Sequence, residues 1–518
     1  MKKNPKQYAL ATCTREATTA GIEIASSGGN AVDVAVASAF DLLVSAVIMC
    51  SIGGGGFALV KTPDGKIELI DFFDCMPGKG IDLNKYRKNA KPDKVLLKCG
   101  TDYEVMVGHA TVTVPGAVKG LELLLKRHGT MPLKELLQPA IRDAKNGTKF
   151  NRNLNDFISI SAKEVHWRSN YIKNILSTPE GEVPGIGYRV KQPELSKTLE
   201  LIAEYGSDVV YKGDIADSII KEIQDNGGLV TYEDLKTYEP TIRKPLETIY
   251  KGKKIWTNPL PSVGGVTLVQ ILNAISHMKI GNKLSPEDVA IIGKIQRKAL
   301  FDKFNKYIDP EKNEEISREL LSSEYALNCY KKILSSPNTT HLSCIDDSGY
   351  AVSITMSMGY GSGVAIPDRG IFMSNSLGEI DLNPRGYLMA QPGEKLVSCM
   401  SPSLMYDEST NDLVVMGSAS SSRISTSLMH VIMNMTDFNM SLHEAINSPR
   451  CHYENNEFSI ETGLEVDDSL LDNETKICWF DTKERFFGGS HCVRYKEGKL
   501  LEAVNDPRRS GSAQTMLI

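Results

Sequence analysis

A hydroxyl-rich hairpin in the last third of the chain is the sequence feature that most restricts the fold. Residues 338–346 read NTTHLSCID, residues 347–349 read DSG and residues 350–357 read YAVSITMS. Two short runs rich in β-branched residues flank an Asp/Ser/Gly cluster, a pattern typical of two antiparallel strands joined by a tight turn. Gly349 supplies the residue that the turn needs at positive φ.

The turn determines which residues of the two strands face each other. With Ser348 at its centre, the facing pairs are Thr339–Ser357, His341–Thr355, Ser343–Ser353 and Ile345–Ala351 on one face, and Leu342–Ile354 and Cys344–Val352 on the other. One face is therefore mostly hydroxyls and the other is apolar, as expected for part of a site. An ordinary half-buried hairpin explains the same pattern, because Ser and Thr are common in strands.

The composition is that of a globular protein with no nucleic-acid or membrane partner. A chain of 518 residues predicts one large or two medium domains. The 59 Lys and Arg residues against 64 Asp and Glu give a net charge of -5, without the basic block that nucleic acid would need. The most apolar window, about 35–50, contains Asp41 and is too short to span a bilayer.

The N-terminus and the cysteines favour a cytoplasmic protein. No apolar run of signal-peptide length follows the basic residues at the start of the chain. The ten cysteines are scattered without a C-x-x-C spacing, so we expect them to be reduced and mostly structural. Cys451-His452 lacks the further ligands of a zinc site.

The chain before the hairpin alternates helices and strands. We expect helices at 15–27, 31–39 and 266–277, mainly helical segments over 117–225, and strands at 57–60, 66–72, 111–114 and 247–257. The glycines at 53–56 are followed by a strand and not by Lys-Ser/Thr and a helix, which favours close backbone packing over a phosphate loop.

After the hairpin, strands are expected at 370–375, 403–407 and 412–417, and a loop of small residues at 418–424 opens a helix. The polar stretch 306–338 is typical of an exposed linker. Nothing after Met373 is long enough for a second independent domain. The strands of both halves are therefore expected to share one core.

Six short motifs, in this order, resemble those of the γ-glutamyltranspeptidase family. They are Gly-Gly-Asn-Ala-Val-Asp (28–33), Gly-Gly-Gly-Gly-Phe (53–57), Val-Pro-Gly (114–116), Pro-Ser-Val-Gly-Gly (261–265), Asn-Thr-Thr-His (338–341) and Asp-Pro-Arg-Arg (506–509). The similarity covers nearly the whole chain. No single motif is decisive, but the six in order are specific.

The resemblance implies an α+β fold of the N-terminal nucleophile hydrolase type, a four-layer αββα sandwich made as one precursor. The precursor would cut itself between Asn338 and Thr339 into segments 1–338 and 339–518, which stay associated as one intertwined domain. It implies no cofactor and no catalytic metal. A homo-oligomer of the associated segments is compatible with the resemblance.

The resemblance also assigns catalytic roles. The hydroxyl of Thr339 would be the nucleophile and its freed α-amine, with a pKa of about 8, would be the base. Ser357 matches the second hydroxyl beside the nucleophile. Ser420 and Ser421 match paired glycines whose backbone N–H groups form the oxyanion hole, where each donor is worth roughly 3 kcal/mol. Serine suits this position only if the backbone there tolerates a Cβ.

Several departures fall in the substrate pocket. Phe73 stands where the family has the Arg that binds the α-carboxylate of the γ-glutamyl group, so a charge-assisted partner is lost unless Arg423 or Lys79 replaces it. Ser376 and Glu379 replace residues that contact the α-amine, and an Asn of the family aligns near Gly359. The family's paired serines align with Ser398 and Cys399, so only the second of them is changed. The segment 380–397 is shorter than the lid of many members, which predicts an open site.

We therefore predict a self-processing Thr-nucleophile amidohydrolase or acyltransferase. It would cleave a γ-glutamyl or related acyl amide and pass the acyl group to water or an amine. A cephalosporin/glutaryl-type acylase is the alternative within the class. An uncut, catalytically inert relative with a structural or binding role is the alternative outside it.

Overall fold

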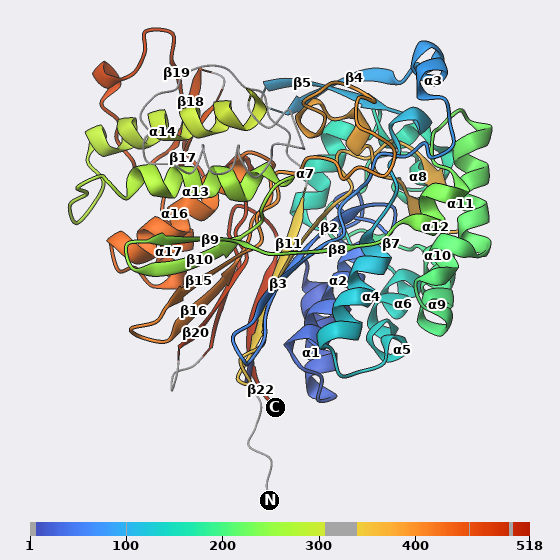
Figure 1. The fold of residues 1–518 in the computed structure, drawn as a ribbon, viewed down its shortest axis with the longest axis horizontal. Helices are drawn as coiled ribbons and strands as arrows, with labels where there is room; N and C mark the ends of the chain where they lie inside the picture. Colours follow the sequence, from blue (N-terminus) through green and yellow to red (C-terminus); the bar gives the residue numbers. More distant parts are fainter. Residues whose placement is uncertain (1–6, 100, 306–338, 455, 497–500) are drawn as a thin grey trace, which may run out of the picture.

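Two antiparallel β-sheets packed face to face, with helices outside each sheet, make up the fold (Figure 1). The computed structural model describes residues 7–99, 101–305, 339–454, 456–496 and 501–518. The predicted 306–338 linker lies outside them. One apolar core lies between the sheets and one lies between each sheet and its helices. The predicted αββα sandwich is confirmed.

Each sheet contains strands from both sides of residue 339. The first sheet has the order β22 (Ser512–Leu517), β1 (Gln7–Thr12), β11 (Thr340–Asp346), β12 (Ala351–Ser357), β2 (Gly55–Lys61), β3 (Ile67–Asp71), β8 (Thr241–Arg243). The second has the order β21 (Glu502–Val504), β20 (Cys492–Lys496), β16 (Asp412–Met416), β15 (Ser403–Asp407), β10 (Lys253–Thr257), β9 (Leu246–Tyr250). Both halves of the chain therefore contribute to the core between the sheets, as the sequence predicts.

The two helical layers lie on opposite sides of the sheets in Figure 1. The helical layer on the side of the first sheet contains α1 (Arg15–Ser26), α2 (Ala31–Ser45), α4 (Ala117–His128), α6 (Gln138–Asn146) and α9 (Pro193–Tyr205). The layer on the side of the second contains α13 (Val263–Ile275), α14 (Pro286–Asn305), α16 (Arg423–Asp437) and α17 (Leu442–Asn447). Every residue of α2 is buried, in agreement with its apolar sequence.

Two predicted strands differ from the structure. Residues 109–111 form a turn of 3-10 helix, and Val114 makes only an isolated bridge to Cys75, because Pro115 and Gly116 lead directly into α4. The strand expected at 370–375 is reduced to β14 (Ile371–Phe372), which pairs with β13 (Ala365–Ile366) outside the two main sheets.

The hairpin has the predicted register at the centre of the first sheet. His341 pairs with Thr355 and Ile345 with Ala351, and the pairing extends outward to Thr340 and Met356. Thr339 is the next residue outward, so it lies opposite Ser357. The N-terminus of α2 is tied to the other end of the hairpin, where the Ala31 N–H donates to Asp346 Oδ2 at 2.7 Å.

The glycine run at 53–56 lets β2 approach β12 closely. A Cβ on Gly54 would lie 2.3 Å from the Ser357 carbonyl oxygen, and one on Gly56 would lie 2.3 Å from the Thr355 carbonyl oxygen. Real Cβ atoms do not approach so near, so these positions need glycine. The structural interpretation of the run is confirmed, and the run holds the end of β12 in place.

Candidate active site

The head of the hairpin opens into a small cavity where most of the predicted site residues meet. The described residues that line it are Phe73, Thr339, Ser357, Gly359, Ser376, Glu379, Leu382, Ser398, Cys399, Met400, Ser421 and Ile424. They come from segments up to about 350 positions apart, which the two sheets bring together. Two predicted site residues are not in this set. Ser420 immediately precedes the lining residue Ser421 in the chain, and Asn338 lies outside the described residues.

Thr339 and Ser357 are both well shielded. Their exposed fractions are 5% and 6%, and the cavity measures about 30 Å³, enough for roughly two water molecules. Leu382, from the shortened 380–397 segment, closes part of the wall. The Ser357 Oγ accepts a hydrogen bond from the Gly359 N–H at 2.9 Å, which orients the hydroxyl. A long acyl chain would require wall side chains such as Leu382 to move.

The rest of the hydroxyl face has a structural role. The His341 ring nitrogens are 2.9 Å from Thr355 Oγ1 and 2.9 Å from Ser343 Oγ. Ser343 donates to the His491 carbonyl oxygen, just before β20, and Ser353 donates to the Met416 carbonyl oxygen in β16. Burial, with nearby His491, lowers the pKa of His341 well below its usual value, so the ring is neutral. For these residues the plain-hairpin interpretation is right.

The turn that carries Ser420 and Ser421 has the backbone conformation of glycine. Their φ angles are +86° and +43°, in the left-handed region where a Cβ is strained. No described residue accepts a hydrogen bond from the Ser421 N–H. The two serines therefore hold a left-handed backbone that favours glycine, at a conformational cost of about 1–3 kcal/mol each.

The Ser420 side chain points to a buried arginine. Arg509 donates through Nη2 to the Ser420 Oγ and through Nη1 to the Thr339 carbonyl oxygen at 3.4 Å. The sequence analysis singled out Arg509 only as part of the Asp-Pro-Arg-Arg motif at 506–509. Its position just before β22, the strand that pairs with β1, brings it under the head of the hairpin.

The position of the missing arginine is filled by an aromatic stack. Phe73 is 2% exposed, and its ring centroid lies 5.6 Å from that of Phe57. Neither Arg423 nor Lys79, the proposed substitutes for that arginine, is one of the described residues that line the cavity. Arg423 is 3.0 Å from Glu454 and covers Phe486, and Lys79 donates to Thr237 at 2.6 Å.

Glu379 and Gly359 fit each other sterically. A Cβ on Gly359 would lie 2.1 Å from Glu379 Oε1, so the carboxylate occupies space that a side chain at 359 would need. The same oxygen accepts from the Tyr360 N–H at 3.2 Å. Glu379 is 4% exposed and is the only charged side chain among the described lining residues.

Ser376 and Ser398 are fixed by their own surroundings. Ser376 donates to Asp74 Oδ2 at 2.7 Å, and burial raises the pKa of that carboxyl. The Ser398 carbonyl accepts from the Val263 N–H at 2.8 Å. The Pro-Ser-Val-Gly-Gly motif allows this contact, because a Cβ on Gly264 would lie 2.0 Å from the Cys399 carbonyl oxygen.

Within the described residues, no three His, Cys, Asp or Glu side chains are grouped as metal ligands. No helix in that part of the chain has the length and apolarity to cross a bilayer. The residues gathered here are hydroxyls, one carboxylate and backbone donors, which suit acyl transfer.

Solved structures define the class of protein. Over 99% of the chain, the structure resembles a cephalosporin acylase from Bacillus halodurans with a TM-score of 0.84 and 25% identity, covering 97% of that chain. It also resembles the γ-glutamyltranspeptidase of Helicobacter pylori, with a TM-score of 0.52 and 29% identity over 61% of this chain and 88% of that one. The fold is that of an N-terminal nucleophile hydrolase.

Sequence comparison gives the family. The model described as Gamma-glutamyltranspeptidase matches residues 17–516. The glutathione hydrolase proenzyme of Escherichia coli (strain K12) is 31% identical, covering 97% of this chain and 90% of its own length. The acylase ACY 1 proenzyme of Pseudomonas sp. (strain SE83) is 30% identical, with 94% and 90% covered. The chain belongs to the γ-glutamyltranspeptidase family and is an amidohydrolase or acyltransferase of that kind.

Proposed function

We propose that the chain cuts itself before Thr339 and then uses the new terminus to cleave a γ-glutamyl or related acyl amide. One observation carries the proposal. Thr339 lies at the head of β11, opposite Ser357, and both line the cavity that Ser421 also lines. Relatives named as proenzymes support the cut, and segments 1–338 and 339–518 would remain associated through their shared sheets.

The chemistry follows from the new terminus. The Thr339 hydroxyl attacks the amide carbon while its proton passes to the α-amine. The oxyanion receives hydrogen bonds from the backbone N–H groups at 420 and 421. The C–N bond then breaks, the departing nitrogen takes the proton, and the acyl group remains as an ester on Thr339. Water or an amine attacks this ester, releasing the acid or a new amide. Ser357 supports the nucleophile.

The cavity wall suggests how the acyl group is selected. Glu379, its one charged side chain among the described residues, would attract an α-amine and repel a carboxylate. Ser376, Ser398 and Cys399 would contribute polar contacts, and Phe73 an apolar surface. The α-carboxylate of a γ-glutamyl group has no cationic partner on the described wall.

An acylase is the second candidate, and two observations favour it. None of the described lining residues is Lys or Arg, and the whole chain resembles a cephalosporin acylase. An acyl group without the amino-acid end would not need the missing clamp. Four anilides separate the candidates: γ-glutamyl, γ-aminobutyryl, glutaryl and butyryl. A preference for the γ-glutamyl and γ-aminobutyryl anilides, whose acyl groups carry an amine, supports the first candidate. A preference for the glutaryl or butyryl anilide supports the second.

A denaturing gel of the purified protein tests the processing step. Fragments of 338 and 180 residues are expected from a chain of 518, with mass spectrometry placing Thr339 at the start of the smaller one. Thr339→Ala should stay uncut and inactive, while Thr339→Ser keeps a hydroxyl and should still be cut. If Thr339→Ala were cut at the same bond, the nucleophile assignment would be wrong. A wild-type chain that stays intact on prolonged incubation would favour an inert relative.

We also propose a cellular compartment for the protein, from the state of its cysteines. Eight described cysteines form no disulfide, and seven of them are buried. Buried thiols without disulfides favour a reducing compartment such as the cytoplasm.

A further inference from the structure

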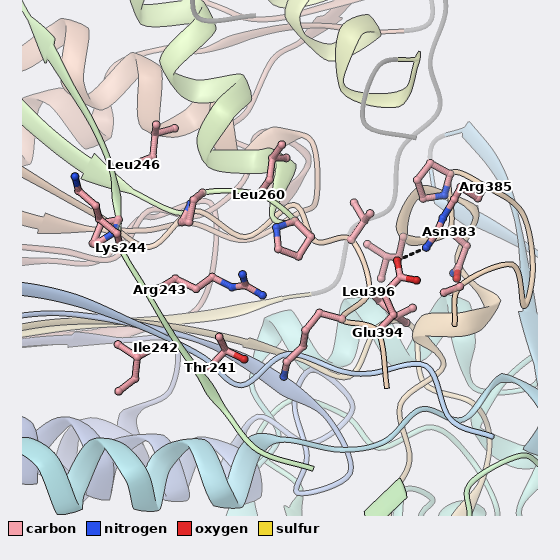
Figure 2. A pocket seen from close by; sticks show the side chains of 18 of the residues that line it. Thr241, Ile242, Arg243, Lys244, Leu246, Leu260, Asn383, Arg385, Glu394 and Leu396 are labelled. Carbon is pink, nitrogen blue, oxygen red and sulfur yellow. Dashed lines mark hydrogen bonds and ion pairs between the residues drawn. The ribbon is translucent and has the colours of Figure 1, made fainter. Parts of the chain in front are cut away.

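A large groove lies beside the catalytic cavity (Figure 2). It measures about 940 Å³, and its walls come from residues 241–246, 259–261 and 382–397. Leu382 lines both the groove and the cavity, and groove residues 394–397 continue directly into Ser398 of the cavity wall. A molecule lying in the groove can therefore reach toward Thr339.

The described groove wall carries four cations and one carboxylate. The cations are Arg243, Lys244, Arg385 and Lys395, and the carboxylate is Glu394. Arg385 and Glu394 form an ion pair, drawn dashed in Figure 2, and so offset each other. Among the described residues, the acidic partner recorded for Arg243 and Lys395 is the buried Asp71. The described part of the groove therefore has an excess of positive charge.

Arg243 is placed to bind a carboxylate. Its Nε donates to Asp71 Oδ2 at 2.7 Å, which fixes the side chain. Neither terminal nitrogen has a recorded partner among the described residues, and the side chain is 26% exposed. Figure 2 shows its guanidinium group directed into the groove. A guanidinium edge presents two parallel donors that match the two oxygens of a carboxylate.

Two lysines extend the positive surface. Lys244 is exposed, and no ion pair with a described residue is recorded for it. Lys395 is 11% exposed and donates to the Phe73 carbonyl oxygen at 2.7 Å and to Tyr238 at 2.8 Å. Its charge therefore lies where the groove meets the cavity wall.

We propose that this groove binds the amine side of the scissile amide, and that the preferred leaving or accepting amine is an acidic peptide with two or more carboxylates. The inference rests on the proposed function of Thr339. The cavity at Thr339 is only about 30 Å³, so the part of the substrate beyond the scissile nitrogen must lie outside it. The groove is the adjoining open space, and its charge selects anions.

Calorimetry with peptides tests binding without requiring turnover. Triglutamate should bind the full chain at least about fivefold more tightly than triglutamine at low salt, and the difference should shrink in about 0.5 M salt. Lys244→Glu should weaken triglutamate binding about fivefold, while Lys244→Arg should not. Arg243→Lys keeps a cation for Asp71 but loses the two-donor edge, so it should also weaken binding.

A matched control lies on a helix that does not line the groove. Lys197 is an exposed lysine on α9, a helix whose main contacts are with α5 (Leu133–Leu136), α6 and α10 (Asp208–Lys212). Lys197→Glu changes the net charge by the same amount as Lys244→Glu and should leave triglutamate binding unchanged. An equal effect of both variants would show only a general charge effect and would overturn the proposal, as would equal binding of the two peptides.

Kinetics separate this inference from the proposed function. Two amides with the same acyl group and either a diacidic or a neutral amine side should differ in KM, with kcat similar. If carboxylates on the acyl side alone lowered KM, the groove would be wrongly assigned. If no amide were cleaved, the Thr339 proposal would fail, while the peptide measurements would still decide whether the groove binds acidic peptides.

Discussion

Arg509 joins the proposed nucleophile to the proposed oxyanion turn. One terminal nitrogen donates to the Thr339 carbonyl oxygen at 3.4 Å and the other donates to the Ser420 Oγ. Burial, reinforced by nearby Arg485, lowers the pKa of Arg509 to about 10, so it stays charged at neutral pH. A residue near the C-terminus therefore fixes the relative positions of groups 89 and 170 residues earlier in the chain.

Arg509→Lys is expected to lower kcat at least about tenfold with a smaller change in KM, because one ammonium group cannot hold both contacts in the planar geometry of a guanidinium. The measurement is steady-state kinetics on an anilide together with the rate of self-cleavage. A thermal melt of the same variant reports any structural loss. Full activity with a lowered Tm would mean that Arg509 only stabilises the fold.

Ser421→Gly should keep activity within about threefold and should raise or maintain Tm. Glycine adopts the observed φ of +43° without strain, although it also has more freedom to lose on folding. The backbone N–H, the proposed oxyanion donor, is unchanged by the substitution. A loss of kcat above about a hundredfold, comparable to removal of one oxyanion donor, would show that the Ser421 hydroxyl takes part in catalysis.

Phe73→Arg should raise turnover of the γ-glutamyl anilide relative to the γ-aminobutyryl anilide, which lacks only the α-carboxylate. The new guanidinium replaces a ring that is 2% exposed, so Tm should fall by several degrees because a charge is buried without a partner. Added glutamate should restore part of that loss. Phe73→Leu removes the ring without adding charge and serves as the control. An unchanged anilide ratio would show that another group already binds the α-carboxylate.

Buried histidines should make stability depend on pH between about 6.5 and 4.5. Burial lowers the pKa of His491 to about 4 and that of His430 to about 3. Below pH 6.5 the unfolded chain binds protons that the folded chain does not, so unfolding becomes easier as pH falls. Each histidine contributes up to roughly 1.4 kcal/mol per pH unit.

Thermal melts at several pH values check this prediction as a difference in slope. Burial raises the pKa of Asp41 and Asp74, and these carboxyls act in the opposite direction, so variants are compared with wild type. His491→Gln should lose less Tm than wild type between pH 6.5 and 4.5. His443→Gln alters an exposed histidine on α17 and should follow wild type. Identical slopes for all three proteins would contradict the assignment.

Much of the fold was predictable because local rules dominate it. The hairpin register follows from side-chain alternation and a short turn, and the glycine run correctly predicted close backbone packing. The strand expected at 370–375 is shorter because a strand requires a continuous partner: Ile371 and Phe372 pair with β13, and Met373 makes only an isolated bridge to Gly53. Arg509 was missed as a contact of Thr339 because no local pattern links the two positions.

The sequence by itself determined the central hairpin, the order of motifs and the position of Ser357 opposite Thr339, because each depends on neighbouring residues or on family resemblance. Only the tertiary structure decided which hydroxyls reach the cavity. Packing of the second sheet engages Ser343 and Ser353, and His341 engages Thr355, which leaves Thr339 and Ser357 on the wall. The basic groove is likewise a product of packing, since its walls come from segments about 140 residues apart.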